Sequence, residues 1–259
     1  MTVLEKFRLD GRTAIVTGGN RGIGKGISRG LAQAGANVVI ANRNAEQGQA
    51  AAAEIANETD QSVISVETDV TDDETVAALA AATIEQFDSI DILVNNAGMT
   101  INTPAEEMTL DEWNTVIDVN LSGVFRCTRH IGDYMISQES GSIINISSIS
   151  AFIANYPQPQ VSYNASKAAL EGFKNQLAAE WATHGIRVNN INPGYVRTEL
   201  IDGVLEADPA MAEQWFDQML LDEMATPDDI APLAVYLASD AASYVTGTSV
   251  IIDGGYTVR

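Results

Sequence analysis

Short β-branched segments alternate with helix-like stretches from one end of the chain to the other. The strand-like segments are Thr13–Thr17, Asn37–Ala41, Ser62–Val66, Asp91–Asn95, Ser142–Ser147, Arg187–Asn192 and Ser249–Ile252. The helix-like stretches are Gly22–Ala34, Ala45–Glu58, Asp72–Phe87, Leu110–Ser137 (two helices or a bent one) and Val161–Thr183. Several strand-like segments lack period-two alternation, as expected of strands covered on both faces. The alternation predicts an α/β fold: a doubly wound, Rossmann-type parallel sheet of about seven strands, with helices on both faces.

One domain accounts for residues 1–259, because no Pro/Gly/Ser-rich linker, internal repeat or low-complexity run divides the chain. The least regular part is residues 195–229, which contains Gly203, Pro209 and Pro227. We expect this part to fold over a ligand as a lid. Within it, the apolar Trp215, Phe216 and Met219 are expected to pack the lid.

The composition, 46% hydrophobic and 19% charged, is typical of a globular protein. No apolar stretch reaches the roughly 18 residues that a membrane-spanning helix needs, and residues 1–10 contain no apolar signal-peptide core. Cys127 is the only cysteine, which excludes an internal disulfide. We therefore expect a cytoplasmic protein without a membrane partner.

The charge balance is strongly acidic. The chain has 14 Lys and Arg against 35 Asp and Glu, a net charge of -21. Such a charge disfavours nucleic acid and anionic membranes as partners. It indicates adaptation to high salt, where screening relieves self-repulsion, although an ordinary acidic surface is the simpler alternative.

A glycine-rich turn follows the first strand-like segment directly and opens the first helix. Its sequence is Gly18-Gly19-Asn20-Arg21-Gly22-Ile23-Gly24. Glycines at this place leave room for a pyrophosphate, and the free N–H groups and positive end of the helix would point at it. The sequence therefore predicts a dinucleotide site in the first βα unit.

A phenol and an ammonium lie four residues apart near the start of the longest helix. They belong to Tyr163 and Lys167, which share one helix face. A phenol ordinarily titrates near pH 10, and a neighbouring cation lowers that pKa toward working pH. The pair is therefore a candidate for proton transfer to and from oxygen.

The glycine spacing Thr17-Gly18-x-x-x-Gly22-x-Gly24 and Tyr163-x-x-x-Lys167 together resemble the short-chain dehydrogenase/reductase family. The resemblance extends over nearly the whole chain, through Asn95-Asn96-Ala97-Gly98, Asp69-Val70 and Pro193-Gly194. It implies that Thr198 contacts the nicotinamide carboxamide. The full set of implied cofactor contacts is Gly18, Asn20, Arg21, Gly22, Ile23, Gly24, Asn42, Arg43, Asp69, Val70, Asn96, Ala97, Gly98, Tyr163, Lys167, Pro193, Gly194, Val196 and Thr198.

The same resemblance implies four catalytic residues: Asn120, Ser148, Tyr163 and Lys167. Tyr163 would move the proton, Ser148 would hold the substrate oxygen, Lys167 would tune Tyr163 and bind ribose, and Asn120 would hold a water for proton relay. The alignment selects Ser148 rather than Ser147, which would pack below it. The gap from Ser148 to Tyr163 is about two residues longer than is commonest in the family.

The end of the second strand favours NADP(H) over NAD(H). An NAD enzyme generally needs an acid here to bind the ribose 2′-hydroxyl, and this chain has Asn42. Arg43 and Arg21 could both reach a 2′-phosphate, unless both are solvated surface groups. Some polyol relatives with an acid at position 42 use NAD.

The segment Ile153–Gln160 and the C-terminal segment Ala242–Tyr256 resemble the family's polyol branch, which includes mannitol, sorbitol and galactitol dehydrogenases and sorbose reductase. Asn155 could offer an amide to hydroxyl groups, or be an ordinary loop residue. The expected reaction interconverts a secondary alcohol and a ketone in a polyol, ketose or sugar. Two alternatives are a reductase of 3-oxoacyl or apolar ketones, and a nucleotide-sensing regulator without catalysis.

Two further expectations concern assembly and metals. The last strand lies within Gly247–Tyr256 and would be an exposed edge in a monomer, and the family usually covers this edge by forming a homotetramer. His130 and His184 lack metal-ligand spacing, so we expect no metal site and treat both as structural residues.

The net charge of -21 predicts a thermal stability that rises with salt concentration. Screening by molar salt weakens the mutual repulsion of surface carboxylates in the folded protein. The melting temperature should therefore increase from low to molar KCl. A flat or falling melting temperature would contradict salt adaptation and leave an ordinary acidic surface.

Overall fold

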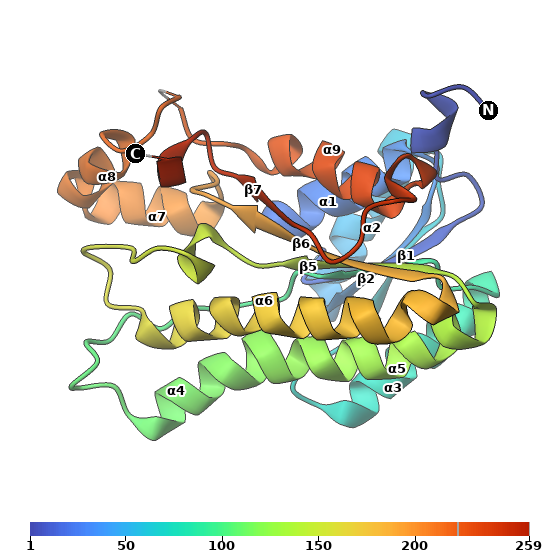
Figure 1. The fold of residues 1–259 in the computed structure, drawn as a ribbon, viewed down its shortest axis with the longest axis horizontal. Coiled ribbons are helices and arrows are strands. Elements are labelled where there is room, and N and C mark those ends of the chain that lie inside the picture. Colours follow the sequence, from blue (N-terminus) through green and yellow to red (C-terminus); the bar gives the residue numbers. More distant parts are fainter. Residues whose placement is uncertain (222, 259) are drawn as a thin grey trace.

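Seven parallel strands form one sheet in the order β3-β2-β1-β4-β5-β6-β7 (Figure 1). The computed structural model describes residues 1–221 and 223–258. The strands are β1 (Thr13–Thr17), β2 (Asn37–Asn42), β3 (Val63–Glu67), β4 (Ile92–Asn95), β5 (Gly141–Ile146), β6 (Ile186–Pro193) and β7 (Ser249–Ile252). This arrangement confirms the expected Rossmann-type α/β fold. The strand order reverses between β1 and β4, where open α/β sheets bind ligands at the carboxyl ends of their strands.

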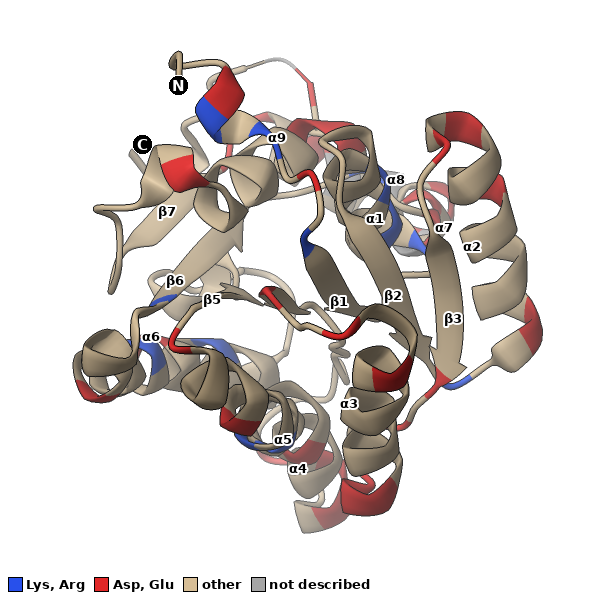
Figure 2. Ribbon diagram, turned by 90° about the vertical axis from the view of Figure 1, so that its right-hand side faces the viewer, with Lys and Arg blue, Asp and Glu red and all other residues tan. Residues whose placement is uncertain are grey.

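Helices cover both faces of the sheet. One face carries α1 (Gly22–Gln33), α2 (Ala45–Thr59) and α9 (Pro227–Ala238). The other carries α3 (Asp73–Phe87), α5 (Gly123–Gln138) and α6 (Val161–Trp181) (Figures 1 and 2). The remaining α-helices are α4 (Leu110–Ile117), α7 (Glu199–Ala207) and α8 (Pro209–Phe216). As expected, Leu110–Ser137 holds two helices, α4 and α5, joined by a π-helical turn over Asp118–Ser122.

Successive side chains of the central strands pack into two separate cores, one on each face of the sheet. In β1, Ala14 and Val16 pack into the core shared with α1, α2 and α9, whereas Ile15 packs into the core shared with α3, α5 and α6. All five residues of β1 are buried. This explains why the strand is apolar throughout instead of alternating, as both of its faces are covered.

Local sequence signals set several helix boundaries. The Asn44 side chain accepts a hydrogen bond from Gln47 N–H at the start of α2, and Asp72 caps α3 in the same way. Thr109 and Glu112 form a capping box on α4. Each satisfies N–H groups that the first helical turn leaves unpaired.

The segment 195–229 is more regular than its sequence suggested, because it contains α7 and α8. Trp215 and Met219 are buried in a third apolar cluster with Ile149 and Tyr256. Phe216 is 41% exposed, so its expected packing role stays a prediction. Helix α9 was not predicted; it has Pro227 in its first turn and tolerates Pro232 in its interior.

Acidic residues recur along the outer surfaces of α2, α3 and α4, and basic residues are sparse (Figure 2). Several of the basic residues form ion pairs with neighbouring acids. For example, Lys25 and Arg29 of α1 both pair with Glu54 of α2. In the described ranges, no helix is long and apolar enough to span a membrane.

Candidate active site

The start of α6 places Tyr163 and Lys167 under the carboxyl end of β5. Lys167 Nζ lies 5.6 Å from the centroid of the Tyr163 ring. Burial raises the pKa of the Tyr163 phenol, and a hydrogen bond with Ser148 partly offsets this. The sequence predicted that the Lys167 charge would dominate and lower this pKa; in the structure, desolvation is the largest influence on the phenol and raises its pKa instead.

Lys167 is itself a strongly perturbed group. Only 4% of the residue is exposed, and its Nζ donates a 2.7 Å hydrogen bond to the Ile146 carbonyl. Burial lowers the pKa of the ammonium to about 8. In the part of the chain that the structure describes, no carboxylate pairs with Lys167 to offset this. A buried cation without a counter-ion is costly, and such groups cluster at functional sites.

Ser148 follows β5 and faces Tyr163, whereas Ser147 turns away from it. The Ser148 hydroxyl donates to Ser150 Oγ over 3.0 Å and accepts from Ser150 N–H. The Ser147 hydroxyl donates to the Lys167 carbonyl over 3.1 Å, beneath the site. The structure therefore places Ser148, and not Ser147, beside the phenol, as the alignment predicted.

Asn120 lies in the π-helical turn between α4 and α5 and is fully buried. Its side chain accepts from Met99 N–H and donates to the Met99 carbonyl, both over 2.8 Å, and it also donates to Ser166 Oγ. The side chain thus fixes the loop after β4 against α6. Single π-helical turns are frequent at functional sites, because they redirect residues that a regular helix would bury elsewhere.

The glycine-rich turn has the geometry of a phosphate cradle. Gly18 and Gly22 adopt φ values of 64° and 51°. A Cβ on Gly24 would lie 2.2 Å from the Gly18 carbonyl oxygen, so only glycine fits there. Among the described residues, no side chain caps the N-terminus of α1. Its first N–H groups are therefore available to a pyrophosphate, and these residues fit a bound dinucleotide.

Asn96 ties the end of β4 to this turn. Its side chain donates to the Thr17 and Gly18 carbonyls over 2.9 and 3.2 Å, and Thr17 Oγ1 accepts from both Asn96 and Ala97 N–H. A Cβ on Gly98 would lie 3.6 Å from Lys167 Nζ. The segment Asn96–Gly98 thus bridges the cofactor turn and the catalytic pair.

Asn42, at the end of β2, is held in place from three sides. Its Nδ2 donates to the Asn44 carbonyl over 2.6 Å, its Oδ1 accepts from Ser65 Oγ over 3.3 Å, and a Cβ on Gly48 would clash with it. Arg43 and Arg21 are exposed, and neither forms an ion pair with any residue in 1–221 or 223–258. The nearby Asn20 side chain donates to Gln47 Oε1 over 3.3 Å.

The other expected cofactor residues lie around the same edge. Asp69 Oδ1 accepts from Thr71 N–H and Oγ1; burial raises its pKa, but these bonds and the charge of Arg43 hold it below the usual value. Thr198 caps α7, and its methyl would lie 3.3 Å from a Cβ on Gly22. The remaining members of the group are Ile23 in the first turn of α1, Val70 after Asp69, Pro193 at the end of β6, Gly194 packed against Asp253, and the buried Val196.

Comparisons with known proteins agree with this geometry. A family model described as Enoyl-(Acyl carrier protein) reductase matches residues 18–257. A galactitol 2-dehydrogenase of Rhizobium johnstonii is 42% identical over 99% of both chains. The chain belongs to the short-chain dehydrogenase/reductase family.

Two further relatives bear on chemistry. A sorbose reductase of Candida albicans is 37% identical over 98% of this chain and 90% of its own. The crystal structure of a gluconate 5-dehydrogenase from Burkholderia cenocepacia, in complex with NADP and tartrate, is 35% identical with a TM-score of 0.93 and full coverage of both chains. The family assignment makes this chain an NAD(P)-dependent oxidoreductase acting on CH–OH groups.

A belt of polar side chains adjoins Ser148, and only one of its members, Asn155, was predicted from the sequence. The polar belt consists of Ser150, Asn155, Gln158, Gln160, Asn164 and Tyr195. Asn155 is only 7% exposed and lies 3.5 Å from the Tyr195 hydroxyl and 3.3 Å from Asn164 Nδ2. The sequence signal for the belt was the high density of amide side chains in residues 155–164. Tyr195 follows β6, far along the chain from these amides, so its place in the belt could not be predicted from the sequence.

The two histidines lie away from this edge. His130 Nε2 is 3.0 Å from Asp73 Oδ1 on the outside of the sheet, a carboxylate partner that the sequence did not reveal. His184 ends a short 3₁₀ helix just before Gly185, which adopts a φ of 69°.

The desolvated Lys167 predicts a specific pH dependence of stability. Its pKa is about 8 in the folded protein and 10.5 in its unperturbed form, so between these values only the unfolded chain keeps the proton. The free energy of unfolding of wild type, minus that of Lys167→Met, should therefore rise from pH 7.5 to pH 10.5, by on the order of 3 kcal/mol. Urea unfolding across this range measures it; a constant difference would mean that Lys167 keeps an ordinary pKa.

Proposed function

We propose that the chain is an NADP(H)-preferring dehydrogenase/reductase that interconverts a secondary alcohol and a ketone in a neutral polyol, ketose or sugar. The observation that carries the proposal is the polar belt of uncharged amides and hydroxyls beside Ser148 and Tyr163. The resemblance to galactitol 2-dehydrogenase and sorbose reductase supports the same substrate class.

In the proposed reaction, the protein transfers one proton and the cofactor transfers one hydride. The nicotinamide, when bound, supplies or accepts the hydride at carbon. Tyr163 donates the proton to the carbonyl oxygen, or takes it from the alcohol, and Ser148 holds that oxygen by a hydrogen bond. Lys167 would bind ribose and favour the phenolate as it forms, against the desolvation that raises the pKa of the Tyr163 phenol in the structure. Asn120 positions the loop after β4 and the relay water.

The preference for NADP(H) rests on the end of β2. Asn42 brings no negative charge to repel a 2′-phosphate, and its amide is committed to the Asn44 carbonyl and Ser65. Arg43 and Arg21 are exposed and unpaired in the described structure, so both guanidinium groups can bind a phosphate. The NADP complex of the similar gluconate 5-dehydrogenase also supports the proposal.

Replacing Arg43 by Ala should lower kcat/KM for NADP(H) by roughly tenfold to a hundredfold, and for NAD(H) by no more than about twofold, because only NADP(H) carries the 2′-phosphate. Asn42→Asp should shift preference toward NAD(H). Steady-state kinetics with each cofactor measures both effects. Arg8→Ala, at a distant arginine paired with Asp10, is the matched control. A wild type that prefers NAD(H) would refute the proposal.

The substrate class follows from the chemistry of the polar belt. Its members donate and accept hydrogen bonds without net charge, and the described part of the belt contains no arginine, lysine or carboxylate. Such a surface can exchange hydrogen bonds with several neutral hydroxyl groups, offers no cation to a carboxylate and is too polar to suit an acyl chain. A ligand rich in hydroxyls therefore fits best.

A substrate panel tests this proposal. Galactitol, sorbitol and sorbose should give higher kcat/KM than gluconate, 2-butanol or an acetoacetyl thioester. Asn155→Leu should lower kcat/KM for the polyols about tenfold or more, while leaving 2-butanol nearly unchanged, because only a polyol bonds to the amide. Tyr163→Phe, as the chemical control, should bind cofactor and lose most turnover. Highest activity on the thioester would instead favour a 3-oxoacyl reductase.

Residues 195–229 are proposed to act as the substrate lid. Within this segment, Trp215 of α8 stacks on Tyr195, which is also a member of the polar belt, with ring centroids 4.4 Å apart. For assembly we propose a cytoplasmic homotetramer. The edge strand β7 bonds only to β6 in the described chain, and its Ile251 and the nearby Tyr244 are exposed.

A further inference from the structure

A row of amide side chains crosses the sheet beneath the active site. Asn95, Asn145 and Asn190 occupy matching register positions on β4, β5 and β6, and Ser249 continues the row on β7. Asn95 donates to Asn145 over 2.9 Å, and Asn145 donates to Asn190 over 3.0 Å. All three bonds of this amide row point the same way, since Asn190 donates in turn to Glu171 Oε1 over 3.0 Å.

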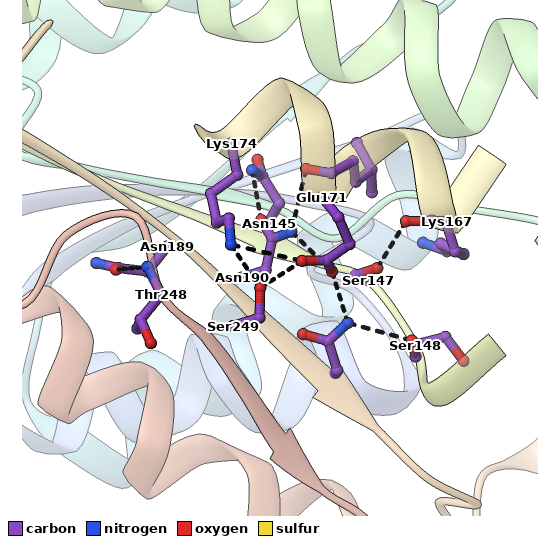
Figure 3. Close-up of polar contacts among 12 residues, drawn as sticks. Asn145, Ser147, Ser148, Lys167, Glu171, Lys174, Asn189, Asn190, Thr248 and Ser249 are labelled. Carbon is purple, nitrogen blue, oxygen red and sulfur yellow. Dashed lines mark hydrogen bonds and ion pairs between the residues drawn. The ribbon is translucent and has the colours of Figure 1, made fainter. Parts of the chain in front are cut away.

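The acceptor at the end of this row is Glu171 (Figure 3). It lies on α6, one helical turn after Lys167 and two turns after Tyr163. Its Oε2 accepts a hydrogen bond from Ser249 Oγ and lies 3.5 Å from Lys174 Nζ. Burial raises the pKa of Glu171, but bonds from Ser249, Asn192 and Asn190 and the charge of Lys174 together hold it below the usual value. The carboxylate is thus charged, fully bonded and fixed.

A second amide connects Glu171 to the catalytic serine. Asn192 Nδ2 donates to Glu171 Oε1 over 2.8 Å and to the Ser148 carbonyl over 3.1 Å. The Ser148 carbonyl also accepts from Ala151 N–H. Asn192 immediately precedes Pro193 of the cofactor loop. The carboxylate of Glu171, on α6, therefore contacts β6 directly and is connected to the Ser148 turn through Asn192.

Lys174 supplies the positive charge that compensates the Glu171 carboxylate. Its Nζ donates to Ser249 Oγ over 2.6 Å, and the residue is 4% exposed. A carboxylate at Glu171 without a nearby cation would be an uncompensated partly buried charge. The pair costs desolvation that an apolar pair would avoid, which indicates a role besides stability.

We propose that Glu171 is a positioning residue: through the Asn192 amide it fixes Ser148 and the Pro193–Gly194 turn relative to Tyr163 and Lys167. It touches neither substrate nor cofactor. The inference rests on the family's oxidoreductase chemistry, and it does not depend on which alcohol is the substrate.

Two double variants separate positioning from stability. Glu171→Gln/Lys174→Met keeps an acceptor for Asn192 and removes both charges together. Glu171→Leu/Lys174→Met also removes both charges but leaves Asn192 with only the Ser148 carbonyl. Asn192→Ala, which leaves the ion pair intact, is a third route to the same loss. Glu180→Gln, at an exposed residue of the same helix, controls for the change of charge.

The Gln/Met variant and Glu180→Gln should keep kcat within about twofold of wild type. The Leu/Met variant and Asn192→Ala should lower kcat about tenfold or more, with unchanged dissociation constants for reduced cofactor, because small displacements of reacting groups are costly. The substrate is whichever member of the panel wild type turns over fastest. Equal kcat in the Gln/Met and Leu/Met variants would overturn the proposal.

Hydrogen exchange followed by mass spectrometry gives a readout that needs no substrate. The Leu/Met variant should exchange faster than the Gln/Met variant at amides in residues 147–151 and 194–196, with equal exchange elsewhere in α6. Melting temperatures of all variants identify any general loss of stability. Faster exchange over the whole chain, or no difference between the two double variants, would show a merely structural role for Glu171.

Discussion

The common direction of all seven strands is the constraint on which the site depends. Parallel strands bring their carboxyl ends to one edge, so the turn after β1, the loop after β4, Ser148 after β5 and Pro193 at the end of β6 become neighbours. None of these segments is close to the others in sequence. Covering both faces of the sheet favours apolar strands, and the catalytic and cofactor-binding groups gather at their carboxyl ends.

Burial at that edge sets the electrostatics of the catalytic pair. Lys167 loses more solvation than it regains from one carbonyl, which lowers its pKa to about 8, and the Tyr163 pKa is raised for the same reason. Burying a charged lysine in this way costs folding free energy, and such costs are typical of functional sites. The surrounding cores, which bury strands such as β1 completely, supply the stability that offsets this cost.

The fold could be predicted because its signals are local. Apolar strands, the glycine turn after Thr17 and the Tyr163–Lys167 spacing each lie within a few residues, and the structure places them as expected. Helix α9 escaped prediction because Pro232 in its interior argues against a helix, and packing against α1 overrides that preference. Tyr195 and Glu171 were missed for another reason: their partners lie on other strands and helices, so only the tertiary structure reveals them.

The amide row shows how a sheet interior can be polar without being unstable. Asn95, Asn145 and Asn190 each donate to the next acceptor, so three buried amides need only one charged group, Glu171, to end the series. Aligned hydrogen bonds in a low-dielectric interior reinforce one another, and a break in the middle would leave several groups unpaired. Glu171 also accepts a hydrogen bond from Asn192, which donates to the Ser148 carbonyl, so the amide row and the Ser148 turn are connected through one carboxylate. The sheet beneath the active site is therefore a hydrogen-bonded support for its geometry as well as a packed core.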